Sequence, residues 1–188
     1  MENVFTEDQL LEIEEGKKEG LDVEKYARPE FLAIQMREIR LGLLKKLPVE
    51  VYARTEYDRF QMQELRLGLE KGLDVKKYAE PKISFAAMRQ IRKGLEDGMD
   101  FSVCRYFPSG VLRELRLGVK DKVDLRKYVR EGYEEEQLAQ IHIALKKELP
   151  IEKYLNRSLR GASIQEIILG LERDLDVSVY AKKEMTWR

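Results

Sequence analysis

The chain has 188 residues, of which 35 are basic and 35 acidic, so its formal net charge is zero. This balance argues against a protein whose whole surface is adapted to nucleic acid or anionic lipid, although it leaves room for a local basic stripe. A hydrophobic content of 43% is enough for a folded core and excludes a disordered acidic or basic tail.

Cysteine usage and hydropathy predict a soluble protein of the cytoplasm. Cys104 is the only cysteine, so no intramolecular disulfide can form, as expected in a reducing compartment. The N-terminal sequence lacks the basic segment and apolar segment of a secretory signal peptide. No run of 18 apolar residues occurs, so we expect no transmembrane helix and no membrane partner.

The phrase LRLGLEKGLDVKKYA at residues 65–79 recurs in altered form along the chain, with a period of 26 residues. Aligned without gaps, the chain contains seven repeats, and only the fourth departs from this length, with 24 residues. The repeats are residues 5–30, 31–56, 57–82, 83–106, 107–132, 133–158 and 159–184. Positions within each repeat are numbered from 1.

Hydrophobic columns keep this register in all seven repeats. Positions 6, 9 and 17 are apolar throughout, and position 22 is tyrosine except at Cys104. Position 9, for example, holds Ile13, Ile39, Leu65, Ile91, Leu115, Ile141 and Ile167. Because positions 6, 9, 13 and 17 share one face of an α-helix, each repeat predicts a long helix of about 13–15 residues with one buried side.

The second half of each repeat predicts a short helix of about two turns, such as Asp74–Ala79. Position 16 is glycine in three repeats (Gly20, Gly72 and Gly98), which is typical of a helix C-terminus. Position 18 then carries aspartate or proline, and both residue types favour the first turn of a helix.

Glycine also occupies position 12 in six repeats, with Ala144 in the sixth. A glycine inside a helix costs about 1 kcal/mol relative to alanine, so its recurrence at one register requires a packing reason. We expect the long helix of the next repeat to cross there, where a β-carbon would hold the two backbones apart. An exposed flexible hinge is the alternative.

A single repeat cannot bury its apolar face alone, so the repeats should stack into a short all-α solenoid. We interpret residues 1–188 as one domain of this kind. The phrases QMQELRLGLEKGLDVKKYAEPK and QMREIRLGLLKKLPVEVYARTE resemble tandem repeats of uncharacterised bacterial proteins, many from Firmicutes and their mobile elements. The resemblance covers nearly all of residues 5–184. It implies helical repeats and transfers no activity or site residues.

The two ends of the stack are expected to differ. Repeat 1 carries Glu14, Glu15 and Lys17 where inner repeats carry arginine, leucine and leucine, as a polar N-terminal cap would. Repeat 7 carries Ile168 at an arginine position, and Met185 and Trp187 resemble the start of an eighth repeat. The second end is therefore predicted to be apolar and to favour self-association.

The sequence shows no catalytic constellation. It contains no phosphate-binding loop, dinucleotide fingerprint, zinc-protease motif or paired-cysteine spacing, so we expect neither an enzyme nor a cofactor or metal. Cys104 and His142 are single substitutions in the tyrosine and arginine columns, so we interpret them as structural and not as a nucleophilic pair. Recurring carboxylates such as Glu38, Glu64 and Glu114 are expected on a solvated helix face.

Arginine recurs at position 10 of repeats 2–5, and position 7 lies one helical turn earlier. Stacking would align these two columns as a ladder: Arg37, Arg40, Gln63, Arg66, Arg89, Arg92, Arg113 and Arg116. One interpretation is structural, with arginines paired to carboxylates such as Glu70 and Glu96. The other is a binding surface, because the planar guanidinium suits phosphate and carboxylate and is enriched at protein interfaces.

Three functional hypotheses follow. The first is a non-catalytic scaffold that binds a protein or peptide through the ladder and the nearby Gln35, Gln61 and Gln137. The second is a nucleic-acid-binding repeat protein whose arginines contact backbone phosphates. The third is a self-assembling structural module. The tyrosine column is expected to fill the core, with its hydroxyls at the edge, and not to stack on bases.

Overall fold

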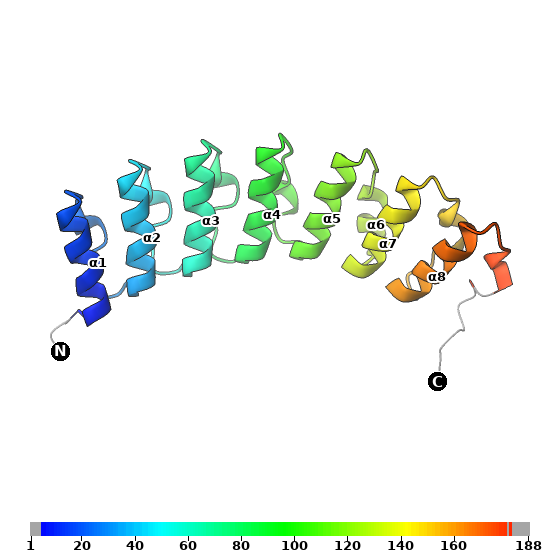
Figure 1. The fold of residues 1–188 in the computed structure, drawn as a ribbon, viewed down its shortest axis with the longest axis horizontal. Helices are drawn as coiled ribbons and strands as arrows, with labels where there is room; N and C mark the ends of the chain where they lie inside the picture. Colours follow the sequence, from blue (N-terminus) through cyan, green and yellow to red (C-terminus); the bar gives the residue numbers. More distant parts are fainter. Residues whose placement is uncertain (1–4, 180, 182–188) are drawn as a thin grey trace. The chain divides into compact units, whose positions relative to one another are not determined.

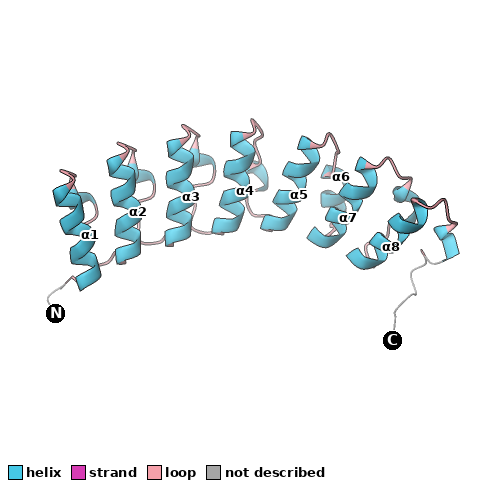
Figure 2. Cartoon of the chain, in the orientation of Figure 1, coloured by secondary structure: helices cyan, strands magenta, loops and turns pink. Residues whose placement is uncertain are grey.

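The computed structural model describes residues 5–179 and 181, and the chain divides into two compact units, Met1–Tyr106 and Phe107–Arg188. The division coincides with the predicted boundary between repeats 4 and 5. All regular secondary structure in the described residues is helical (Figure 2). Within each unit, consecutive long helices pack against each other (Figure 1), which confirms the predicted stack of helical repeats.

Each of the seven repeats contributes one long helix, and each of these helices begins at position 3. The first unit contains α1 (Glu7–Lys18), α2 (Ala33–Leu44), α3 (Arg59–Glu70) and α4 (Phe85–Glu96). The second contains α5 (Ser109–Lys120), α7 (Glu135–Lys146) and α8 (Gly161–Leu171). These helices have 12 residues, or 11 in α8, and are slightly shorter than predicted. None of the helices in the described residues is both long and apolar enough to cross a membrane.

The long helix stops where the backbone turns into the left-handed region at position 16. Gly20, Gly72 and Gly98 have φ angles of 69°, 68° and 76°, as expected for helix-terminating glycines. The other four repeats make the same reversal with other residues, namely Lys46, Lys122, Glu148 and Asp174, at φ angles of 55°, 62°, 55° and 54°. A bond from the position-17 N–H to the position-12 carbonyl closes the turn, as between Leu21 and Gly16 at 2.9 Å.

The second half of the repeat is shorter than the predicted two-turn helix. In six repeats it is a single 3-10 turn: η1 (Val23–Lys25), η2 (Val49–Val51), η3 (Val75–Lys77), η4 (Ser102–Cys104), η5 (Ile151–Tyr154) and η6 (Val177–Val179). Only repeat 5 forms an α-helix there, α6 (Arg126–Glu131). One turn is enough to bring positions 19 and 22 onto the long helix. Of the predicted aspartate caps, Asp100 and Asp124 accept backbone N–H groups at 2.9 and 3.0 Å, whereas Asp74 makes no capping bond.

Buried side chains at positions 6 and 9 form the core from repeat 2 onward, as predicted, whereas positions 13 and 17 are only half-buried or exposed. Two columns that the sequence analysis did not identify complete the core. Position 19 contributes Val49, Val75, Leu125, Ile151 and Val177, and position 1 contributes Phe31, Tyr57, Ile83, Tyr133 and Leu159. Both columns lie outside the long helix, so its helical periodicity could not reveal them.

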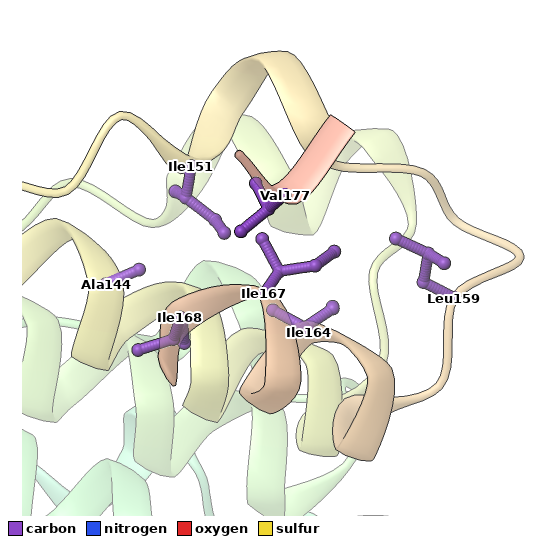
Figure 3. Close-up of a cluster of buried hydrophobic side chains, with 7 residues drawn as sticks. All are labelled: Ala144, Ile151, Leu159, Ile164, Ile167, Ile168 and Val177. Atoms are coloured by element: carbon purple, nitrogen blue, oxygen red, sulfur yellow. The ribbon is translucent and has the colours of Figure 1, made fainter. Parts of the chain in front are cut away.

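The apolar end predicted for repeat 7 is not exposed at Ile168. This side chain is 4% exposed and belongs to a buried cluster of the second unit. In Figure 3, Ile151 and Val177 point from the short segments toward Ile167 of α8. Met185 and Trp187 lie outside the described residues.

At the other end, Glu14 and Lys17 of repeat 1 are exposed as predicted, whereas Glu15 is half-buried and pairs with Arg40 of the next repeat. Leu10 and Leu11 are exposed beside them, however, so the described surface of α1 is not uniformly polar.

The position-12 glycines face their own repeat and not the next one, which corrects the sequence-based explanation. A β-carbon on Gly42 would overlap the hydroxyl of Tyr52 and would lie 2.9 Å from Cγ1 of Val49. Gly16 and Gly68 meet the tyrosines of their own repeats in the same way. The missing side chain thus opens a space that the tyrosine of the same repeat fills.

The position-22 tyrosines of repeats 1–3 are core residues, as predicted, but their hydroxyls bond the long helix and are not at the edge of the core. Tyr26, Tyr52 and Tyr78 are at most 1% exposed, and each hydroxyl donates to a carbonyl of its own long helix. In Tyr26 the acceptor is the Glu12 carbonyl at 2.9 Å, and burial raises the pKa of Tyr26 to about 12. The hydroxyl therefore remains a neutral donor near neutral pH. In repeat 5, by contrast, the Tyr128 hydroxyl donates to the exposed Glu152 carboxylate at 2.6 Å, as predicted for the edge.

Candidate functional site

The position-10 arginines of the first unit lie between repeats and bind carboxylates there. Each Nε donates to the position-8 glutamate of the preceding repeat: Arg40 to Glu12 at 2.9 Å, Arg66 to Glu38 at 2.8 Å and Arg92 to Glu64 at 2.8 Å. All three side chains are largely buried. Within the first unit, the ladder therefore crosses every junction between consecutive repeats.

Each of these guanidinium groups also pairs with at least one further carboxylate. Arg66 pairs with Glu70 and Arg92 with Glu96, the two partners that the sequence suggested. Burial lowers the pKa of Arg66, but the hydrogen bond and charge of Glu38 and the charge of Glu70 outweigh this effect and raise it overall. These arginines are thus neutralised within the stack, in agreement with the structural interpretation.

The position-8 glutamates are not on a solvated face, so that expectation was wrong. Glu64 is 1% exposed, Glu114 is buried and Glu38 is largely covered. Glu64 accepts from two arginines, with Nε of Arg89 and Nε of Arg92 each at 2.8 Å. A buried carboxylate is stable only when it is paired and hydrogen-bonded, and the next repeat supplies that pairing.

The position-7 residues of the predicted ladder face solvent to different degrees. Arg37 is exposed and forms no ion pair with any described residue, and Gln63 is half-buried. Arg89 is bound to Glu64, although its side chain remains 43% exposed. In the second unit, Arg113 pairs with Glu114 and Glu135, each at 3.1 Å.

The last arginine of the predicted ladder, Arg116, is half-buried in α5. The structure thus separates the ladder into buried position-10 links and more exposed position-7 side chains.

Gln35, Gln61 and Gln137 were expected near a binding surface, but their amides join consecutive repeats. Each accepts the N–H of its own helix N-cap and donates to two carbonyls, one near the end of its own repeat and one at the first residue of the following repeat. For Gln61 the acceptors are Pro81 at 2.9 Å and Ile83 at 2.7 Å. Gln9 makes the same contacts, so position 5 forms an inter-repeat clasp wherever it is glutamine.

Cys104 and His142 lie in different compact units and have separate surroundings. Burial raises the pKa of the Cys104 thiol, which disfavours the nucleophilic thiolate. His142 takes the place of the ladder arginine, with Nδ1 at 3.4 Å from Glu114 and Nε2 at 3.1 Å from Asp121. Both residues therefore sit in structural columns of the repeat.

Exposed apolar and arginine side chains gather on the face of the first unit's long helices that is turned away from the core. We call this surface the apolar–arginine stripe, and it consists of the exposed Leu11, Ile34, Arg37, Arg59 and Phe60 together with the half-buried Phe85. These residues occupy positions 3, 4 and 7. Positions 4 and 7 lie roughly opposite the buried positions 6 and 9 on a helix, and position 3 lies at the edge between the two faces. Position 4 changes type between repeats, so no conserved column pointed to this surface.

The aromatic part of the stripe is ordered by contacts between neighbouring helices. The rings of Phe60 and Phe85 lie 5.0 Å apart, and the guanidinium of Arg59 lies 4.3 Å from the Phe60 ring centre. Phe60 is nevertheless 39% exposed, and Ile34 and Leu11 are 45% and 52% exposed. Arg59, like Arg37, is exposed and forms no ion pair with a described residue.

No group of three or more His, Cys, Asp or Glu side chains in the described residues is arranged to hold a metal ion. Comparisons with protein-family models, curated proteins and solved structures return no match. The resemblance of the repeat phrase to bacterial tandem repeats therefore stays a prediction.

Proposed function

We propose that the protein is a non-catalytic helical-repeat scaffold that binds another protein through the apolar–arginine stripe. The observation that supports this most strongly is the combination of exposed Ile34 and Phe60 with the exposed arginines Arg37 and Arg59. Aromatic residues and arginine are enriched in protein interfaces, and a contiguous apolar surface rimmed by polar groups is typical of them.

The chemistry of the stripe defines the partner. Isoleucine, leucine and phenylalanine offer apolar area, whereas Arg37 and Arg59 lack carboxylate partners among the described residues. A complementary segment would bring aliphatic or aromatic side chains together with aspartate or glutamate. Such pairing would give the arginines the carboxylates that Arg66 and Arg92 already have inside the stack.

The nucleic-acid hypothesis receives less support from the same residues. Arg40, Arg66 and Arg92 were to contact phosphates, but each is largely buried against two or more glutamates. A phosphate backbone would have to displace these carboxylates. Of the ladder, the position-7 arginines and the half-buried Arg116 remain for such contacts. In the first unit, Arg37 and Arg59 belong to a surface with apolar side chains that offer nothing to a phosphate.

Site-specific photo-crosslinking tests the proposal. The photoreactive residue benzoylphenylalanine replaces Ile34 in the stripe or, as a control, the exposed Lys76 of η3. We expect a specific protein adduct at position 34 that is absent at position 76. Arg37→Glu should reduce its yield at least fivefold, whereas Arg173→Glu, the same charge change at an exposed site of the second unit, should not.

Two results would contradict the proposal. One is an adduct pattern that is the same at positions 34 and 76, or that Arg37→Glu leaves unchanged. The other is binding of single- or double-stranded nucleic acid at low salt that weakens steeply as salt increases and depends on Arg37, since that behaviour belongs to phosphate recognition.

A further inference from the structure

A groove of about 680 Å³ lies entirely within the second unit, between the N-terminal turns of α5 and α7 and beside α6. Its floor is apolar and includes Phe107, Val111, Val129 and Tyr133. Phe107 is 41% exposed, although the position-1 residues of repeats 2, 3, 4, 6 and 7 are buried. The volume falls in the range of about 300–1,000 Å³ that is usual for ligand pockets.

The groove exists where the glutamine clasp is missing. Val111 occupies position 5 of repeat 5, so it cannot donate to carbonyls at the repeat boundary as Gln61 does to Pro81 and Ile83. Pro108 also replaces the N-cap residue whose N–H the glutamine oxygen accepts elsewhere. Both halves of the clasp are therefore absent, and the apolar ends of α5 and α7 are left without the hydrogen bonds by which Gln137 joins repeats 6 and 7 in the same unit.

The charged residues that line the groove are all acidic: Glu134, Glu135 and Glu136. Glu135 already has an ion-pair partner, because its carboxylate lies against Gly110 and pairs with Arg113 at 3.1 Å. Glu134 and Glu136 are exposed and form no ion pair with any described residue. These carboxylates lie at the N-terminus of α7, where the helix dipole favours negative charge, so an apolar floor is combined with an acidic rim.

We propose that this groove binds a basic, apolar segment of a partner protein. An aliphatic or aromatic side chain of the segment packs on Phe107 and Val111, and a lysine or arginine pairs with Glu134 or Glu136. An adjoining hollow of about 260 Å³ shares Glu135 and Glu136 and continues onto α8 past Gly161, which gives an extended segment a path across the unit. Charge complementarity selects a basic segment, in contrast to the acidic one proposed for the stripe.

Labelled pentapeptides test this site on the full chain. We expect a fluorescein-labelled KLWLK peptide to bind at low salt, as measured by anisotropy, and ELWLE to bind at least tenfold more weakly. The double variant Glu134→Lys with Glu136→Lys should weaken KLWLK binding at least tenfold. The matched control, Glu148→Lys with Glu166→Lys, makes the same charge change at exposed positions of the same unit outside the groove and should leave affinity unchanged.

Phe107→Ser tests the site independently of charge, because it removes an exposed apolar side chain from the floor of the groove. This variant should also weaken the binding of KLWLK at least fivefold. Equal binding of the two peptides, or equal losses in the groove and control variants, would overturn the proposal. So would KLWLK binding that appears only after removal of residues 182–188, since their sequence KKEMTWR has the same chemistry and would then be the occupant. None of these groove variants should change the yield of crosslinking at position 34, so the two tests distinguish the groove from the stripe.

Discussion

The contact between Gly42 and Tyr52 makes a residue-scale prediction in which two effects oppose each other. Gly42→Ala gains about 1 kcal/mol of helix propensity. The added methyl overlaps the Tyr52 hydroxyl, however, and both Tyr52 and Val49 are fully buried. Overpacking costs about 1–3 kcal/mol, and loss of the tyrosine hydrogen bond costs about 1 kcal/mol. We expect urea denaturation to show a net destabilisation of roughly 1–3 kcal/mol from these terms.

A second substitution separates overpacking from other causes. Tyr52→Phe removes the hydroxyl that the new methyl meets, so Gly42→Ala combined with Tyr52→Phe should be less destabilised than the sum of the two single variants. Repeat 6 already carries Ala144, and its Tyr154 is only half-buried. Additive effects in the double variant would refute the proposed reason for the glycine column.

The glutamine clasp gives a second residue-scale prediction with a control on the same helix. Gln61 makes three hydrogen bonds, to Asp58 N–H and to the carbonyls of Pro81 and Ile83. Gln61→Met keeps the length of the side chain but loses all three, so we expect destabilisation of roughly 2–4 kcal/mol at about 1 kcal/mol per bond. Gln63→Met, two residues away, removes no hydrogen bond to a described residue.

Thermal and urea denaturation of the two methionine variants provide the measurement. Gln63→Met should remain within about 0.5 kcal/mol of the unsubstituted chain, as is usual for surface changes. A comparable loss in both variants would mean that the cost arises from the methionine itself, and the clasp would then contribute little.

At the scale of elements, one ion pair joins consecutive short segments and has a pH signature. Nζ of Lys77 in η3 lies 2.7 Å from Oδ2 of Asp100, just before η4. This bond and the Ser102 N–H lower the pKa of Asp100 to about 2. Because the folded-state pKa lies below the ordinary value of 3.8, the stabilisation is present above about pH 4 and is lost as the pH falls toward 2.

An NMR titration of the Asp100 carboxyl carbon measures this pKa directly. Lys77→Ala should raise it toward, but not to, the ordinary value, because the Ser102 N–H remains. Lys76→Ala, at the neighbouring exposed position without an ion pair to a described residue, should leave it unchanged. A midpoint that does not respond to Lys77→Ala would contradict the assigned cause.

Helical periodicity was sufficient to locate the long helices along the chain. It did not show which residues of consecutive repeats contact each other. The register found in the sequence puts the first residue of every long helix at position 3, because apolar spacing reports which side of a helix is buried. The pair Arg40–Glu12 joins residues 28 positions apart, and only the stacking register of two repeats brings them together. The burial of Glu64 was missed for the same reason.

For the whole molecule, the candidate surfaces were less predictable than the fold. The arginine columns were considered as a binding surface because they recur. Recurrence in a stack, however, reflects the contacts that consecutive repeats make with each other. The stripe and the groove instead arise from residues that break the pattern. Phe60 and Ile34 stand where the other repeats carry small or charged residues, and Val111 replaces a clasp glutamine. An alignment of the repeats does not distinguish such departures from random variation. The structure shows which of them lie on the surface.

The division of the chain at the boundary of repeats 4 and 5 leads to a prediction for the whole molecule. The clasps of Gln9, Gln35 and Gln61 all join repeats within residues 1–106, and so do the ladder links of that unit. Because stability in a repeat protein is approximately a sum of repeat and nearest-neighbour terms, these contacts should persist without residues 107–188.

We therefore expect a chain of residues 1–106 to unfold cooperatively by circular dichroism, with a helical signal per described residue close to that of the full chain. A chain that ends at residue 90 is the matched control, because it interrupts α4 before the buried Ile91 and removes Arg92, the link to Glu64. Its midpoint should be clearly lower, since it leaves that buried carboxylate with one arginine fewer. If residues 1–106 were unfolded alone, the links within the first unit would be too weak to hold it, and the second unit would have to supply the missing stability.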